Sequence, residues 1–243
     1  VMTACDLTGA QLQGANLFRS VLNGSNLAGV DFRGMELKLC LLMNANLEGA
    51  NFTGSRLELV KMTGANLRGA NLTRAELSQV QIDETTLDDI VFERTRFEKV
   101  SFDKLDLRPF SLDGLSLRMC SFMKCNMAKM SIEHSDFSMS TFDGADLSGI
   151  RLNHCELTMA TLRTVTLDGA VLGGVKAKGA FFGSSSLKHV QLSGAKLRYA
   201  LFLDSDVSGA VFDGADLRET IFTRANAQGA SFRGARLNYA DIR

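Results

Sequence analysis

The chain has 243 residues, and 27 lysines and arginines balance 27 aspartates and glutamates, so its formal net charge is zero. This balance removes the long-range positive field that drives non-specific nucleic-acid binding, and we expect no nucleic-acid partner. No run of about 18 apolar residues exists, so we expect no membrane-spanning segment. With 22 glycines and a single proline, the sequence predicts unusually uniform turns.

A large apolar residue recurs at every fifth position from Met2 to Ile242. Of the 49 positions in this frame, 47 hold Leu, Phe, Ile, Met or Val, and the exceptions are Ala177 and Ala227. The frame does not shift at Pro109. Neither a helix nor an alternating strand has a period of five, so the chain is built from a repeated five-residue unit.

Two other positions of this unit are regular. The residue two places before the apolar centre is small, as at Ala10 and Ala15, and the residue two places after it is often glycine, as at Gly9 and Gly14. Glycine at a fixed position predicts a turn in which the backbone angle φ is positive.

Residues 45–54, with the sequence Ala-Asn-Leu-Glu-Gly-Ala-Asn-Phe-Thr-Gly, resemble the pentapeptide repeat family, whose unit is A(D/N)LxG. The resemblance covers the whole chain. It implies an all-β fold, a right-handed quadrilateral β-helix in which four units form one coil and the centre and small residues point inward. At 20 residues per coil we expect a single solenoid domain over residues 1–243, with about 12 coils.

The repeat weakens after residue 74. Between Arg74 and Pro109 the turn position holds no glycine, and the small inward residue becomes larger, as at Val80, Ile90 and Phe110. We expect an atypical, wider segment near residues 74–130, and the functional alternative is a bend or a protruding site. The frame runs through both ends of the chain without a cap. We therefore expect either a domain excised from a longer protein or ends covered by a partner or by dimerisation.

The histidines and cysteines occupy regular positions of the repeat, and this explains their placement without a catalytic role. All three histidines occupy outward turn positions, and His134 and His154, which are 20 residues apart, should stack on one face. No third ligand accompanies them, so we expect no metal and no cofactor. No nucleophile elbow and no phosphate-binding loop is present, so we expect no enzyme. All five cysteines occupy the small inward position and indicate buried thiols in a reducing, cytoplasmic compartment: Cys5, Cys40, Cys120, Cys125 and Cys155.

Residues that are 20 apart should line one face of the solenoid. One such column is almost wholly Asn, Asp, Thr or Ser, from Asp6 through Asn26 and Asn46 to Asn226, and it predicts a ladder of polar side chains. On another face the turn position holds outward apolar residues that turn geometry does not require. We predict that these residues bind a partner: Leu39, Leu59, Met119, Met139, Met159, Tyr199 and Tyr239.

A second apolar group lies near the end of the chain, at Phe181, Leu201 and Ile221. These side chains occupy the same outward position in three consecutive coils. They either shield the backbone or form a second contact patch for self-association, so a homodimer through this patch or through an end is one expectation.

These features favour a non-catalytic protein-interaction scaffold that binds a protein partner or a flanking domain. The resemblance implies a domain of a larger bacterial protein, and a secreted effector or secretion-associated protein is one of the forms it allows. The alternative is a DNA mimic that binds a type II topoisomerase, a role of some family members. The zero net charge argues against that alternative, because a mimic needs a strongly acidic surface.

Overall fold

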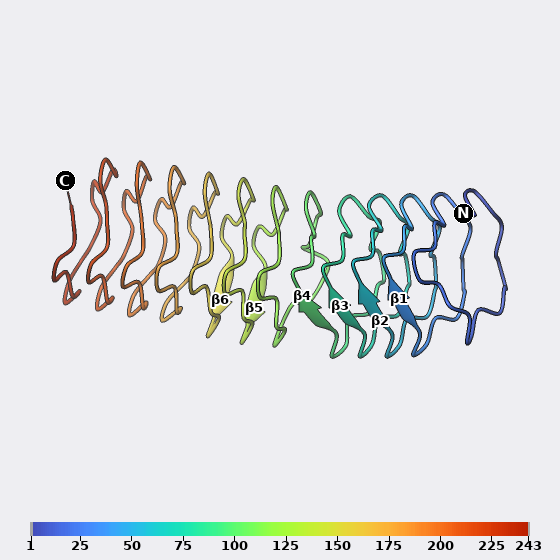
Figure 1. The fold of residues 1–243 in the computed structure, drawn as a ribbon. Helices are drawn as coiled ribbons and strands as arrows, with labels where there is room; N and C mark the ends of the chain where they lie inside the picture. The colour runs from blue at the N-terminus through green and yellow to red at the C-terminus, as the bar shows by residue number, and fades with distance from the viewer. Residues whose placement is uncertain (1, 243) are drawn as a thin grey trace. The chain divides into compact units, whose positions relative to one another are not determined.

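The computed structural model describes residues 2–242, and these residues contain strands, bridges and turns but no helix. The strands are β1 (Glu36–Lys38), β2 (Arg56–Glu58), β3 (Glu76–Ser78), β4 (Arg96–Glu98), β5 (Ser131–Glu133) and β6 (Arg151–Asn153). All pair in parallel (Figure 1). The expected all-β solenoid is therefore confirmed. Only six segments qualify as strands, about half the number of coils expected, because most axial pairing consists of isolated bridges.

The first compact unit is Val1–Leu105, and it holds the four-stranded sheet β1-β2-β3-β4. Its register is 20 residues: Leu37 pairs with Leu57, and Leu57 pairs with Leu77. Isolated bridges keep the same offset on the other faces, as between Asn26 and Asn46. Four units of five residues therefore make one coil, as the sequence predicts.

The second compact unit is Asp106–Arg243, and it holds the two-stranded sheet β5-β6, in which Ile132 pairs with Leu152. Single parallel bridges at the same 20-residue offset continue through the unit, as between Asp206 and Asn226. The expected single domain with an atypical segment near residues 74–130 remains a prediction.

The centre and small positions form the core of each unit, as predicted. Phe32 and Phe52 stack with their ring centroids 4.7 Å apart in the first unit, and Phe202 and Phe222 stack at 4.6 Å in the second. Burying each large apolar side chain contributes about 1.5–3 kcal/mol. The small position stays buried beside them, as at Ala50 and Cys155. The interior of each coil is thus filled by one large and one small side chain from each unit.

The turn position adopts the left-handed conformation at glycines and at other residues alike. Gly14 has φ of +78°, and the non-glycine residues Arg74 and Lys99 have φ of +57° and +53°. The predicted turn is therefore kept in the stretch that lacks glycine. A side chain in this conformation costs roughly 1–2 kcal/mol, so the axial backbone pairing imposes it against local preference.

The predicted polar ladder is present in the first unit. The Asn46 side-chain amide donates to Asn26 Oδ1 at 3.0 Å, and the Asn66 amide donates to Asn46 Oδ1 at 3.1 Å. Each Oδ1 also accepts from a turn amide, as Asn46 Oδ1 does from the Glu48 N–H at 3.2 Å. The ladder therefore links consecutive coils and closes their turns.

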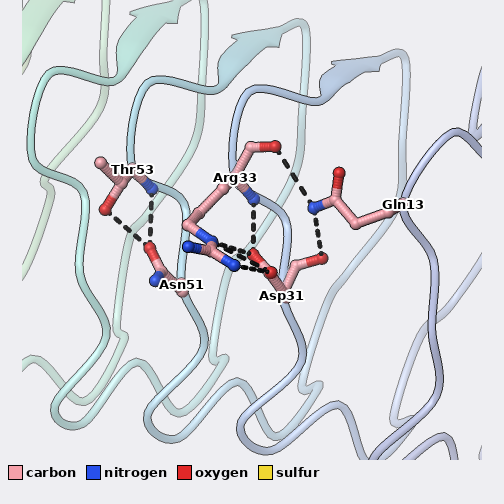
Figure 2. A network of polar contacts seen from close by, with 5 residues as sticks. All are labelled: Gln13, Asp31, Arg33, Asn51 and Thr53. Carbon is pink, nitrogen blue, oxygen red and sulfur yellow. Dashed lines mark hydrogen bonds and ion pairs between the residues drawn. The ribbon is translucent and has the colours of Figure 1, made fainter.

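A neighbouring column closes its turns without a continuous ladder (Figure 2). Asn51 Oδ1 accepts from the Thr53 N–H at 3.0 Å, and Asp31 Oδ1 accepts from the Arg33 N–H at 3.0 Å. The hydrogen bonds from the Arg33 side chain, followed by that from its backbone, lower the pKa of Asp31 to about 2. Asp31 therefore carries a charge that its own turn neutralises.

The cysteines and histidines lie where the repeat predicts. Cys40, Cys120, Cys125 and Cys155 are buried and Cys5 is partly buried. Burial raises the pKa of Cys40 and of Cys155. The rings of His134 and His154 are stacked at 5.0 Å. Within residues 2–242 no cluster of three metal-binding side chains occurs, and no helix is long and apolar enough to cross a membrane.

Candidate partner-binding face

The residues of the predicted partner face stack in register within the second unit. Parallel bridges run from Ser116 to Asp136 and from Asp136 to Glu156, directly before the turns that hold the methionines. The Met119 N–H donates to the Ser138 carbonyl at 3.0 Å, and the Met139 N–H donates to the Thr158 carbonyl at 2.9 Å. The backbone therefore presents one methionine per coil at the same place on the face.

These methionines are exposed although their backbone conformation is unfavourable. The exposed fraction is 40% for Met119, 50% for Met139 and 56% for Met159. Their φ angles are +56°, +62° and +58°, where glycine would be the least strained residue. Turn geometry therefore does not explain why long apolar side chains occupy these three positions.

Ion pairs border the methionine stack. Arg118 pairs with Asp136 at 2.9 Å, and Lys176 pairs with Glu156 at 3.6 Å. Burial raises the pKa of Asp136, but the hydrogen bonding of Ser138 and the ion pair with Arg118 outweigh it and lower the pKa overall. Asp136 is therefore ionised at neutral pH, and this border of the stack is close to neutral.

The face becomes basic at Tyr199. The guanidinium of Arg198 lies 4.6 Å from the centre of the Tyr199 ring, and the Lys178 ammonium lies 5.7 Å from it. Arg198 also pairs with Glu219 at 2.5 Å. Lys178 and Lys196 have no carboxylate within ion-pair distance in the described part of the chain. Tyr199 is therefore an exposed aromatic ring held between cations.

Met159 extends over the next turn. A Cβ atom added at Gly179 would lie 2.6 Å from Met159 Sδ, so the sulfur occupies the space above that glycine. Gly179 is the only glycine of this column. The methionine row therefore continues over it toward Tyr199.

The remaining residues of the predicted face are Tyr239, in the second unit, and Leu39 and Leu59, in the first. Tyr239 belongs to the same column and is 90% exposed. Leu39 and Leu59 belong to the first unit, where they follow β1 and β2, and Lys38 pairs with Glu58 at 2.8 Å beside them. Leu59 is 37% exposed and Leu39 is half-buried. We name Met119, Met139, Met159 and Tyr199 the methionine–tyrosine face.

The second predicted patch is also in register. Bridges join Phe181 to Leu201 and Leu201 to Ile221, and all three side chains are half-buried. A Cβ atom added at Gly183 would lie 2.5 Å from Cζ of Phe181, so the ring covers its own turn. Phe181 thus shields backbone, which is the structural role the sequence allowed. A contact patch for self-association here remains a prediction.

Two features of these surfaces were not expected from the sequence. The first is the pair of cations around Tyr199. The repeat predicts that Lys178 and Arg198 point outward, but their contact with the Tyr199 ring depends on side-chain conformation. Phe18 is 51% exposed in the first unit, with the Arg19 guanidinium 5.2 Å from its ring centre. An aromatic residue at an outward position was the signal that could have identified it.

Family models match most of the chain. A model described as pentapeptide repeats (8 copies) matches residues 5–42, 40–79, 166–202 and 200–238. A second, described as a pentapeptide repeat region, matches residues 95–172. A comparison with curated proteins found no match.

Two solved structures are among those similar to this chain. HetL, a pentapeptide repeat protein involved in heterocyst differentiation regulation from the cyanobacterium Nostoc sp. strain PCC 7120, is 23% identical. The match covers 99% of this chain and 88% of HetL, with a TM-score of 0.32. A trypsin-treated form of QnrB1, a plasmid-mediated fluoroquinolone resistance protein, is 13% identical over 81% of this chain and 90% of its own, with a TM-score of 0.37. We draw nothing about function from either.

Proposed function

Because the chain belongs to the pentapeptide repeat family, we propose that it is a non-catalytic protein-interaction scaffold whose partner docks on the methionine–tyrosine face. The observation that carries the proposal is the stack of Met119, Met139 and Met159, exposed in three consecutive coils. Their left-handed backbone conformation costs free energy that a glycine at the same position would avoid.

The chemistry of the stack suits a protein partner. Methionine is unbranched and polarisable, so a row of thioethers adapts its shape to an apolar surface placed on it. Covering apolar area contributes about 25 cal/mol per Å² removed from water. The ion pairs bordering the stack would form a polar rim around an apolar centre, which is the usual anatomy of an interface.

Tyr199 and the two unpaired lysines favour a partner with carboxylates beside its apolar contact. Lys178 and Lys196 would attract such groups, and Tyr199 supplies a rigid aromatic contact. We place the chain in a larger bacterial protein of a reducing compartment, so the partner is either a separate protein or a flanking domain. Self-association through the Phe181 patch would be independent of this face.

The test is affinity capture with two matched double variants. Met139→Lys with Met159→Lys changes two consecutive coils of the face. The control, Thr164→Lys with Ser184→Lys, changes two consecutive non-glycine turn residues with φ of +53° and +56° in another column of the same unit. We expect the first pair to abolish capture of the partner that the wild-type chain retains, and the control pair to keep it. Equal capture by both would contradict the proposal.

A further inference from the structure

Axial pairing is interrupted between the first and second coils of the first unit. The Leu7 N–H donates to the Asn26 carbonyl at 2.8 Å, and the Arg19 N–H donates to the Lys38 carbonyl at 3.0 Å. Between these points, within the described residues, no backbone hydrogen bond joins residues 11–17 to residues 31–37. The first coil therefore bows away from the second over about two pentapeptides.

Gln13 spans the opening that results (Figure 2). Its side-chain amide nitrogen donates to the carbonyls of Asp31 and Arg33, each at 3.3 Å. In a regular coil these carbonyls would accept directly from backbone amides, as those of Asn51 and Thr53 do. The backbones of the first and second coils are therefore farther apart here, because the Gln13 side chain lies between them in place of direct backbone hydrogen bonds.

Main-chain groups face this opening without partners. In regular coils the Asn51 N–H donates to Val30 at 3.0 Å and the Arg56 N–H donates to Met35 at 2.9 Å. The residues one coil earlier, Asp31 and Glu36, have no such acceptor among residues 2–242. A strand edge with free amide groups is a template for another strand.

The opening is large enough for a ligand. It encloses about 510 Å³, within the range of about 300–1,000 Å³ typical of ligand sites. Its lining includes Gln13, Asn16, Phe18, Met35, Glu36 and Lys38. Met35, which is only 7% exposed, and the exposed Phe18 supply apolar surface to this lining.

One carboxylate in the lining, that of Glu36, is held only by a longer-range attraction to the Lys38 ammonium. Lys38 is paired with Glu58, whereas the Glu36 carboxylate makes no hydrogen bond or ion pair in the described part of the chain. Asp31, next to the opening, is neutralised by Arg33 at 2.6 Å. A cationic group beside Glu36 would therefore be favoured.

We propose that this slot, between residues 13–18 and 31–38, binds an extended peptide segment of a partner protein that carries a lysine or arginine. The segment pairs its main chain with the free amide of Glu36 at the edge of β1, places apolar side chains against Met35 and Phe18, and sets its cation beside the Glu36 carboxylate. This is recognition by strand addition. It is independent of the methionine–tyrosine face.

The experiment is amide hydrogen exchange on the full chain, with the capped peptides Ac-Thr-Val-Lys-Val-Thr-NH₂ and Ac-Thr-Val-Glu-Val-Thr-NH₂ as probes. Without peptide, the amides of Asp31 and Glu36 should exchange freely, whereas those of Asn51 and Arg56 should be protected. The lysine peptide at millimolar concentration should slow exchange at Glu36 by about tenfold, and the glutamate peptide should have a weaker effect. Protected amides in the free protein, or unchanged exchange with peptide, would overturn the proposal.

Two variants keep the test specific. Glu36→Gln should remove the preference for the lysine peptide and leave the protection of Asn51 unchanged. Asn16→Trp, at an outward position of the lining, should crowd the slot and abolish the effect of both peptides. Asp6→Trp, at the same position of an earlier unit and outside the lining, should not. A lysine preference that survives in Glu36→Gln would contradict the assigned contact.

Discussion

Met159 Sδ lies 2.6 Å from the position that a Cβ atom of Gly179 would occupy, so the two residues are packed as a unit on the methionine–tyrosine face. Gly179→Ala should displace the Met159 side chain and shift its methyl resonance in an NMR spectrum. It should also destabilise the second unit by roughly 1–2 kcal/mol, because the new side chain sits at φ of +65°.

Gly174→Ala is the control, since Gly174 has φ of +68° and open space where its Cβ would be. It should cost the same stability without moving the Met159 methyl signal. The Met159 side chain is flexible, so both variants should denature at similar urea concentrations. An unchanged Met159 signal in Gly179→Ala would show that the contact does not exist in solution.

The asparagine ladder makes a graded prediction for stability. Asn46 takes part in three hydrogen bonds, with Asn26, Glu48 and Asn66, whereas the Asn71 side chain accepts one, from the Thr73 N–H at 2.9 Å. Asn46→Ala should therefore destabilise the first unit by about 1–2 kcal/mol more than Asn71→Ala. Urea denaturation measures both. Equal losses would mean that the ladder contributes nothing beyond turn closure.

Acid should remove the stability that the Asp216–Arg218 ion pair contributes to the second unit. The Arg218 hydrogen bond outweighs burial and lowers the pKa of Asp216 from 3.8 to about 2. A depressed carboxyl pKa contributes stability that is present above pH 3.8 and is lost as the pH falls toward 2. Arg218→Gln should raise the pKa of Asp216, measured by carbon NMR of the carboxyl group, and should flatten this pH dependence. An unchanged pKa in Arg218→Gln would contradict the pairing.

The five-residue period, together with the resemblance to the pentapeptide repeat family that implies four units per coil, was sufficient to predict the fold, the core and the turns. It placed Phe32 and Cys155 inside, gave Gly14 a positive φ, and stacked His134 on His154, because each of these follows from position in a strict repeat. It also placed Met119, Met139 and Met159 in one exposed column. Whether that column binds a partner is a separate matter that position alone does not decide.

The repeat could not predict side-chain conformation or local backbone pairing. The period directs Lys178 and Arg198 outward, but it does not say that both approach the Tyr199 ring. It likewise assigns Gln13 an ordinary outward position, although here the side chain replaces two backbone hydrogen bonds. Both depend on which of several similar contacts is lowest in free energy, and a periodic pattern carries no information on that choice.

The most direct test of the scaffold proposal is site-specific photo-crosslinking in cells. A benzophenone amino acid replaces Met159 in one chain and Ser184 in the other, because both are non-glycine turn residues with nearly the same φ, +58° and +56°. We predict a discrete crosslinked protein from position 159, absent from position 184 and lost when Met139→Lys is added. No crosslink at position 159, or the same product from both positions, would contradict partner binding at the methionine–tyrosine face.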